Sequence, residues 1–216
     1  MIKKIINNYK YVSFDVFDTL IERKCLTPEQ LFINTGIKVL GNRNKTEYLK
    51  IRKQAENNAY NSLGAQATLD DIYNNMNVFN NKTISNLKRE EINQELANCY
   101  PKKKIQDIYK YAVESNKKII IISDMYLSKD IISKMLKKCG YDRYEKLYVS
   151  NEYGVDKRSG KLFDLVLKKE NIESNDIIHI GDSLKADILG AKKNNIKSIF
   201  IPRKKMISRY LKKIGV

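Results

Sequence analysis

The chain has 216 residues, of which 42% are hydrophobic, and this length suits one substantial α/β domain with a smaller insertion. No long uncharged apolar segment occurs, so we expect no membrane span, and the N-terminus has no apolar stretch long enough for a signal peptide. The cysteines Cys25, Cys99 and Cys139 form no CxxC pair, which argues against a disulfide framework or a zinc site and favours a reducing cytoplasm.

The formal net charge of +16 raises the question of a nucleic-acid partner. Basic residues are spread along the chain and mostly fall on expected helix faces. Only the C-terminal tail concentrates them without acidic neighbours, at Arg203, Lys204, Lys205, Arg209, Lys212 and Lys213. We therefore expect the basic residues to form a solvated surface, and we do not expect the protein to bind nucleic acid. Whether the tail contacts a polyanion stays open.

The first expected element is a short buried strand at the start of Tyr11–Leu20 (YVSFDVFDTL), whose first residues are apolar or β-favouring. The segment then reaches the polar residues Asp15, Asp18 and Thr19. Carboxylates at the C-terminal tip of a strand lie where open α/β sheets bind their ligands. This segment is therefore the first candidate for a functional site.

Helical patterns follow as far as Pro101. Their marks, in chain order, are an N-cap at Thr27 followed by Pro28, an apolar face of Ile51, Ala55 and Ala59, a capping box from Thr68, and the spacing of Leu87, Ile92 and Leu96. Residues 21–101 are predicted to form an inserted all-helical domain, and 1–20 with 102–216 the core domain. Such an insert would lie over the strand tips like a lid.

From Lys102 onward, helices alternate with apolar strands. The expected strands are Lys118–Ser123, Leu147–Val149, Ile177–Ile180 and Ser198–Ile201. Continuous Ile and Val runs separated by amphipathic helices indicate a parallel sheet that is covered on both faces. The predicted fold class is therefore α/β, a doubly wound, Rossmann-like parallel sheet of about five strands with the helical insert.

A second group of acids follows the strand Ile177–Ile180, at Asp182 and Asp187. If this strand and the first one belong to the same parallel sheet, the acids meet Asp15 at one edge and can hold a divalent cation. His179 lies inside the apolar strand and is expected to be a packed core residue with no catalytic role.

Four segments resemble the ordered motifs of the haloacid dehalogenase-like (HAD) hydrolase superfamily. They are DVFDT at Asp15–Thr19, IIISD ending at Ser123 and Asp124, Lys157 in GVDKRSGKLF, and IGDSLKAD at Ile180–Asp187. Each motif alone is weak, but the four occur in the expected order from Tyr11 to about Ile201. The insert resembles the helical type-1 cap of that family.

The resemblance implies a Mg²⁺-dependent phosphatase that acts on a small phosphorylated metabolite through an aspartyl-phosphate. By this resemblance Asp15 attacks phosphorus. The magnesium ion is held by the carboxylates of Asp15 and Asp182 and the main-chain carbonyl of Phe17, and Asp187 orients waters or Lys157.

The remaining motif residues are implied to bind substrate. Ser123 and the backbone amides around Asp124 hold a phosphoryl oxygen, and Thr19 ties down the loop after the nucleophile. Lys157 offsets the charge of the nucleophile and the phosphate. Lys161 is the alternative lysine, and the family spacing favours Lys157.

The first motif departs from the family pattern. Most phosphatases of the family have a second Asp two residues after the nucleophile, which protonates the leaving group. Here that residue is Phe17, and the next acid is Asp18, which projects to the opposite side if the segment is extended. Three explanations stay open: Asp18 or a cap residue donates the proton, the leaving group needs none, or the reaction is a different one.

Two other functions stay open. A metal-independent dehalogenase needs no second Asp, although dehalogenases of this superfamily generally lack the GD metal motif. Arg52 in the insert could anchor a substrate anion, as a cap arginine does in dehalogenases, or it could be a solvated helix arginine. A low-activity binding protein is the third function, suggested by Phe17 and the basic tail.

The DVFDTL form of the first motif, Asp15–Leu20, also resembles that of a bacterial hydrolase group. That group is often associated with surface-polysaccharide synthesis. The resemblance implies a phosphosugar or a nucleotide-linked sugar as substrate.

Overall fold

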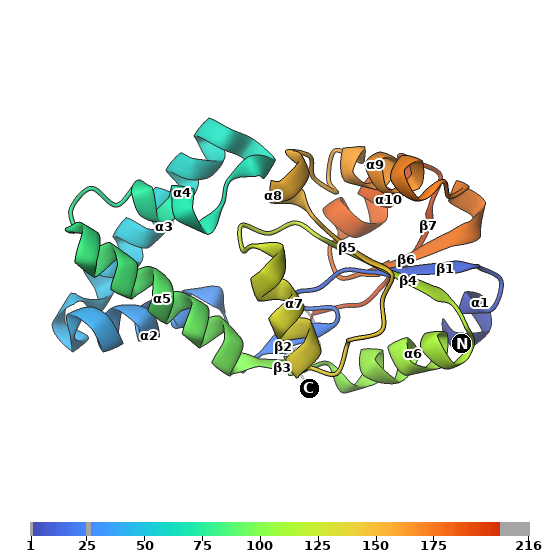
Figure 1. Ribbon diagram of the computed structural model, residues 1–216, viewed down its shortest axis with the longest axis horizontal. Helices are drawn as coiled ribbons and strands as arrows, with labels where there is room; N and C mark the ends of the chain where they lie inside the picture. Colours follow the sequence, from blue (N-terminus) through green and yellow to red (C-terminus); the bar gives the residue numbers. More distant parts are fainter. Residues whose placement is uncertain (1, 25–26, 204–216) are drawn as a thin grey trace, which may run out of the picture.

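The computed structural model describes residues 2–24 and 27–203, and its centre is a five-stranded parallel sheet (Figure 1). The strands are, in spatial order, β5 (Lys146–Val149), β4 (Lys118–Ser123), β1 (Tyr11–Phe14), β6 (Ile177–Gly181) and β7 (Lys197–Phe200). The bounds of the predicted strands agree with these to within one residue. The predicted α/β fold with a doubly wound parallel sheet is confirmed.

Helices cover both faces of the sheet (Figure 1). One face carries α1 (Ile2–Ile6), α6 (Lys103–Glu114) and α7 (Lys129–Lys138), and the other carries α9 (Lys161–Glu170), the π-helix η4 (Leu184–Leu189) and α10 (Gly190–Lys192). The short helices α8 (Ser150–Tyr153) and η3 (Ser174–Asp176) lie in connections. Alternate residues of β4 therefore enter two separate cores: Ile119 and Ile121 pack toward α6 and α7, and Ile120 and Ile122 toward α9.

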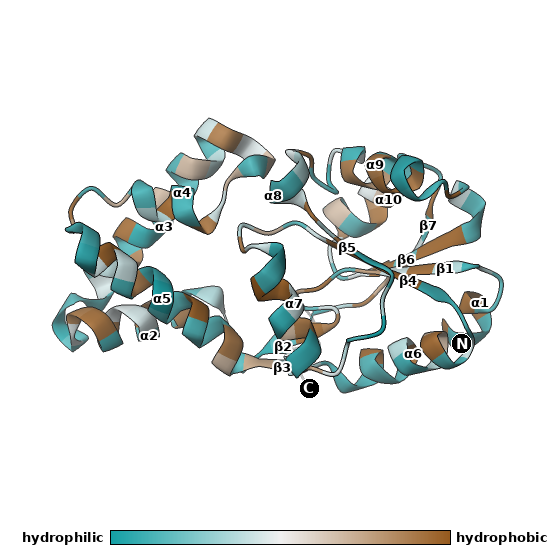
Figure 2. Ribbon diagram, viewed as in Figure 1, coloured by the Kyte–Doolittle hydropathy of each residue, from teal (hydrophilic) through white to brown (hydrophobic). Residues whose placement is uncertain are grey.

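The insert follows β1 in the sequence. Its elements are β2 (Ile21–Arg23), α2 (Pro28–Leu40), η1 (Asn42–Asn44), α3 (Lys45–Leu63), η2 (Gly64–Gln66), α4 (Leu69–Asn74), α5 (Asn81–Asn98) and β3 (Cys99–Pro101). The four main helices occur where the sequence predicts them, and the capping box of Thr68 with Asp71 is present. Figure 2 shows hydrophilic and hydrophobic residues alternating along α5, as expected of a helix with one buried side.

Two short strands join the insert to the sheet domain. β2 and β3 pair antiparallel, with Ile21 opposite Pro101 and Arg23 opposite Cys99. They have no recognisable sequence signal and were not predicted, because three-residue strands are too short to display a periodicity. Their pairing therefore holds together the two points at which the chain leaves the sheet domain and returns to it.

The insert contacts the sheet domain beside the carboxyl ends of the strands. Tyr126, three residues beyond β4, accepts a hydrogen bond at its carbonyl from the Leu69 amide at 2.9 Å. The side chain of Gln66 lies against Gly154, which follows α8. Among the described residues, the structure has no helix with the length and apolar character that crossing a membrane requires.

Candidate active site

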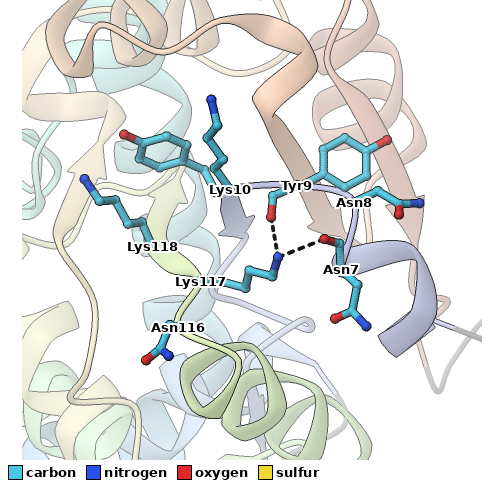
Figure 3. Close-up of a pocket in the computed structure, with 8 residues that line it drawn as sticks. Asn7, Asn8, Tyr9, Lys10, Asn116, Lys117 and Lys118 are labelled. Carbon is cyan, nitrogen blue, oxygen red and sulfur yellow. Dashed lines mark hydrogen bonds between the residues drawn. The ribbon is translucent and has the colours of Figure 1, made fainter.

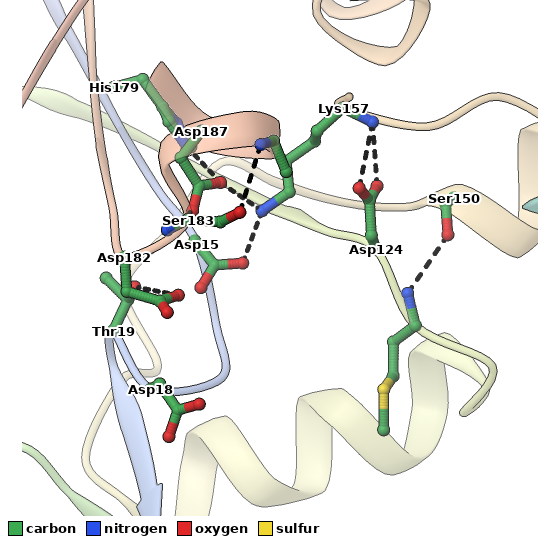
Figure 4. Close-up of polar contacts among 12 residues, drawn as sticks. Asp15, Asp18, Thr19, Asp124, Ser150, Lys157, His179, Asp182, Ser183 and Asp187 are labelled. Carbon is green, nitrogen blue, oxygen red and sulfur yellow. Dashed lines mark hydrogen bonds and ion pairs between the residues drawn. The ribbon is translucent and has the colours of Figure 1, made fainter. Parts of the chain in front are cut away.

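Three carboxylates converge at the carboxyl edge of the sheet (Figure 4). Asp15 comes directly after β1, Asp182 directly after the neighbouring β6, and Asp187 lies in η4. Oxygen atoms of the three side chains lie within 4.8 Å of one another, and all three residues are buried. The two strands run parallel with Phe14 opposite Ile180, so the acids that follow them reach the same edge.

Lys157 lies among these acids. Its ammonium nitrogen is 2.5 Å from Oδ1 of Asp15 and 2.6 Å from Oδ1 of Asp187, and its side chain is only 3% exposed. The loop that carries it is held by Asp124, whose two carboxylate oxygens accept hydrogen bonds from the Lys157 amide at 3.0 and 3.1 Å. The alternative lysine, Lys161, is exposed on the first turn of α9.

Burial and charge pull the pKa values of this group in opposite directions. Burial raises the pKa of Asp15 well above its ordinary value, although Lys157 opposes the rise. Burial would also raise the pKa of Asp187, but Lys157 and His179 hold that pKa far below its usual range. Burial would lower the pKa of Lys157, yet the carboxylates of Asp15 and Asp187 raise it. The lysine is therefore charged and Asp187 ionised at neutral pH.

Two glycines make room for this arrangement. A Cβ atom on Gly181 would lie 2.2 Å from Cγ of Asp187, and one on Gly190 would lie 2.0 Å from the carbonyl oxygen of Lys157. Neither position can carry a side chain without moving a member of the group. The glycine of the GD motif thus allows Asp187 to approach the sheet.

Ser123 and Thr19 border the same edge. Thr19 donates a hydrogen bond of 3.4 Å to Oδ1 of Asp182, so it ties the loop after β1 to the end of β6. Ser123 ends β4, and its buried hydroxyl has no hydrogen-bond partner among the described residues. A buried polar atom without a partner costs free energy, so this hydroxyl is available to a ligand.

Asp18 lies apart from the three grouped carboxylates (Figure 4). Its backbone has φ of 60°, a left-handed conformation, and its side chain is 43% exposed. The ring of Phe17 lies 4.5 Å from the Arg23 guanidinium, measured to the ring centroid. The Phe17 side chain therefore packs against Arg23 and has no acidic group to donate a proton.

Sequence reasoning missed the contact of Arg203 with the site. Its Nε atom is hydrogen-bonded to Asp182 and is 3.5 Å from Oδ2 of Asp18. In the sequence Arg203 belongs to the basic tail, but in the structure it follows β7, which is the neighbour of β6 in the sheet. The strand order could have placed it at this edge. The other tail residues, 204–216, and Cys25 lie outside the described residues.

His179 is buried in β6, as predicted, with its ring 4.8 Å from that of Phe163 between centroids. Both ring nitrogens nevertheless make polar contacts. Nε2 lies 3.1 Å from Oδ1 of Asp187, and Nδ1 lies 2.9 Å from the hydroxyl of Ser13. The sequence offered no signal for these contacts, because they depend on strand register and on the fold of η4.

Arg52 is not solvated: its side chain is 0% exposed. The guanidinium forms two hydrogen bonds with Glu91, at 2.7 and 2.8 Å, and a third with Glu56 at 2.8 Å. It also lies 4.3 Å from the ring centroid of Phe32. Two carboxylates therefore already offset its charge, which weakens the expectation that it binds a substrate anion.

We expect Arg52→Met to lower the free energy of unfolding by about 3–5 kcal/mol, because Glu91 would stay buried without its cation. Urea denaturation followed by circular dichroism measures the change. Arg89→Met, on the exposed side of α5, is the matched control and should change stability by less than about 0.5 kcal/mol. A large rise in KM with unchanged stability would instead make Arg52 the substrate anchor.

Two pockets lie outside this group. One pocket, of about 310 Å³, lies between the insert and the sheet domain, with Lys88 on one side and Ser128 on the other. The second, of about 430 Å³, lies beside the amino ends of β1 and β4 (Figure 3). There the Lys117 ammonium donates hydrogen bonds to the carbonyls of Asn7 and Tyr9. The second pocket is at the sheet edge opposite the three acids, so it is no part of the candidate site.

A family model described as haloacid dehalogenase-like hydrolase matches residues 13–201. No curated protein matches the sequence. Among solved structures, the magnesium-bound form of the putative HAD-hydrolase YfnB from Bacillus subtilis has a TM-score of 0.64 and 17% identity, over 95% of this chain and 99% of that chain.

Two further structures carry names of different activities. The L-2-haloacid dehalogenase from Xanthobacter autotrophicus, with chloropropionic acid covalently bound, has a TM-score of 0.65 and 13% identity over 96% of this chain and 84% of that chain. A predicted phosphoglycolate phosphatase from Haemophilus somnus 129pt has a TM-score of 0.60 and 14% identity over 92% and 91%.

At such identities these structures establish the fold alone, and their names include both a phosphatase and a dehalogenase. The family model, in contrast, spans most of the chain, from β1 to the residue after β7, and includes all four motifs. The chain belongs to the haloacid dehalogenase-like hydrolase family.

Proposed function

We propose that the protein is a Mg²⁺-dependent phosphatase that acts on a small phosphorylated metabolite through an aspartyl-phosphate. The observation that carries this proposal is the grouping of Asp182 and Asp187 with Asp15. Displacement of a halide by a carboxylate requires no cation, whereas phosphoryl transfer requires neutralisation of the charge on the phosphoryl oxygens. A cluster of three acids that can hold a cation, with one lysine among them, therefore suits phosphoryl transfer.

The donor set fits magnesium, since hard divalent cations prefer oxygen ligands. The carboxylates of Asp15 and Asp182 and the main-chain carbonyl of Phe17 would hold the ion, with Asp187 beside them. When bound, the ion supplies positive charge that offsets the phosphoryl oxygens. The Arg203 guanidinium, which lies against Asp182, would have to share that carboxylate or move from it.

Asp15, Lys157 and Ser123 would act on the substrate and the nucleophile. A carboxylate oxygen of Asp15 forms the bond to phosphorus while the bond to the leaving group breaks, and water later releases phosphate and restores the carboxylate. The hydrogen bond from Lys157 to Oδ1 keeps that carboxylate in one orientation. The partnerless hydroxyl of Ser123 would donate to a phosphoryl oxygen.

The leaving group distinguishes two substrate classes. Asp18 lies outside the cluster of Asp15, Asp182 and Asp187, and Phe17 has no acidic proton to donate. We therefore propose a leaving group that departs without protonation, as in an acyl phosphate or a diphosphate. A phosphosugar, whose alkoxide leaves poorly, would lose roughly 10²–10⁴-fold in rate without a proton donor, so it would require Asp18 or a residue of the insert.

We further propose that residues 21–101 form a type-1 cap over a core of residues 1–20 and 102–216. Support comes from the contacts of Leu69 and Gln66 beside the carboxyl edge of the sheet. A cap so placed would exclude water from the acids and supply substrate contacts. The DVFDTL motif and the cysteine pattern support a bacterial, cytoplasmic enzyme.

A phosphate-release screen tests this function. The panel contains acyl phosphates, diphosphates, nucleotides and sugar phosphates, each assayed with Mg²⁺ and with EDTA. We expect release from at least one compound, abolished by EDTA and restored by excess Mg²⁺. Metal-independent chloride release from 2-chloropropionate, without any phosphate release, would reject the phosphatase and favour a dehalogenase.

A further inference from the structure

His179 is the single histidine of the chain, and it lies at the centre of a row of buried polar contacts that starts outside the motifs. Ser13 in β1 is its register partner across the sheet. Their side chains meet at 2.9 Å, between Oγ of Ser13 and Nδ1 of His179. Neither residue has a place in the chemistry proposed above.

The row continues to the nucleophile. Nε2 of His179 lies 3.1 Å from Oδ1 of Asp187, the same oxygen lies 2.6 Å from the Lys157 ammonium, and that ammonium lies 2.5 Å from Asp15 (Figure 4). The second oxygen of Asp187 accepts a hydrogen bond of 2.8 Å from the Ser183 amide. Asp187 thus has three donors, of which His179 approaches from the side of the sheet.

The chemistry of the groups determines which of them donate. An ionised carboxylate only accepts hydrogen bonds, so Nε2 of His179 must carry the hydrogen. His179 is fully buried in the sheet with its ring against that of Phe163, where a neutral imidazole avoids the cost of burying a further charge, so Nδ1 is left as an acceptor. The hydroxyl of Ser13 then donates to Nδ1 at 2.9 Å in preference to the Ile178 carbonyl at 3.4 Å.

We propose that Ser13 and His179 are positioning residues: the Ser13 hydroxyl selects the Nε2–H tautomer of His179, and that N–H holds Asp187 where it receives Lys157. This inference rests on the proposed function for its consequence in catalysis. Lys157 contacts Asp15 and Asp187 together, so a rotated Asp187 would draw the ammonium away from the nucleophile. Outer groups that orient charged site residues typically contribute about 10–100-fold to activity.

The tautomer can be observed without any substrate. Because His179 is the only histidine, ¹⁵N-labelled protein purified with a histidine-free tag gives one pair of imidazole nitrogens in a long-range ¹H–¹⁵N spectrum. We expect Nε2 to resonate as a protonated nitrogen and Nδ1 as an unprotonated one at neutral pH. Ser13→Ala should shift the Nδ1 resonance or mix the tautomers. A wild-type ring protonated at Nδ1 overturns the inference.

Two substitutions of His179 test the consequence. His179→Gln can place an amide N–H near the position of Nε2, and His179→Leu fills the space without a donor. We expect His179→Leu to lower kcat by about 10–100-fold with little change in KM, and His179→Gln to recover most of it. Thermal unfolding of both proteins separates this effect from a loss of folded protein.

Equal kcat values for the folded Leu and Gln variants would overturn the inference, because a role in packing alone does not distinguish a donor from its absence. If the wild-type protein releases phosphate from no compound, the proposed function fails. In that case the imidazole spectrum still decides between the two tautomers, so the two failures are distinguishable.

Discussion

Asp15→Asn is expected to lower phosphate release by at least ~10³-fold, because an amide oxygen cannot replace the carboxylate that attacks phosphorus. The substitution preserves the shape of the side chain and an oxygen that can accept from Lys157. The fold should therefore persist, as judged by circular dichroism and the melting temperature. Steady-state release of inorganic phosphate, at saturating substrate and Mg²⁺, measures the effect.

A matched control is Asp164→Asn on α9, a half-exposed aspartate whose ion pair with Lys168 lies at the surface. This variant should keep the activity of the wild type. Trapping of a ³²P-labelled aspartyl-phosphate from labelled substrate should succeed with wild-type protein and fail with Asp15→Asn. Retention of activity within tenfold by Asp15→Asn would reject the nucleophile assignment, whatever the substrate.

Lys157→Met should have the second largest effect, on both activity and stability. The ammonium contacts two buried carboxylates, Asp15 at 2.5 Å and Asp187 at 2.6 Å. Its removal leaves them without a cation, and breaking a buried pair in this way costs about 3–5 kcal/mol of stability. Activity should fall by roughly 10³-fold, because the lysine also orients the nucleophile. Urea denaturation and phosphate release measure the two effects.

Lys161→Met is the control, since this lysine is exposed and begins α9. It should leave activity unchanged and alter stability by less than about 0.5 kcal/mol. The comparison also tests the assignment of Lys157, which the motif spacing favours, against the alternative, Lys161. A larger loss of activity in Lys161→Met than in Lys157→Met would transfer the assignment to Lys161.

Much of the fold could be read from local patterns. The run of isoleucines in Lys118–Ser123 and the capping residue Ser128 are short-range signals, and the structure has the strand and the helix where they indicate. The convergence of Asp15 with Asp182 followed from one further rule, that parallel strands end at a common edge. No such rule could indicate β2 and β3, whose pairing joins residues about 80 positions apart in the chain.

These local patterns could not predict the polar contacts in the interior of the protein. Arg52 has the sequence context of an ordinary helix arginine, and its burial depends on Glu91 in another helix. His179 looks like one residue of an apolar strand until Ser13 and Asp187 are placed beside it. A charged or polar side chain can be buried only where partners compensate its desolvation. Whether such a residue is buried therefore depends on residues elsewhere in the chain.

The sequence by itself determined the main strands and helices in their order along the chain, the family motifs, and the edge of the sheet at which the acids gather. These depend on hydrophobic periodicity and on residues close together in the chain. Only the tertiary structure decided that Asp124 holds the Lys157 loop, that Arg203 lies against Asp182, and that Arg52 is already paired. Those facts depend on distances of a few ångströms between side chains distant in sequence, which register and packing alone establish.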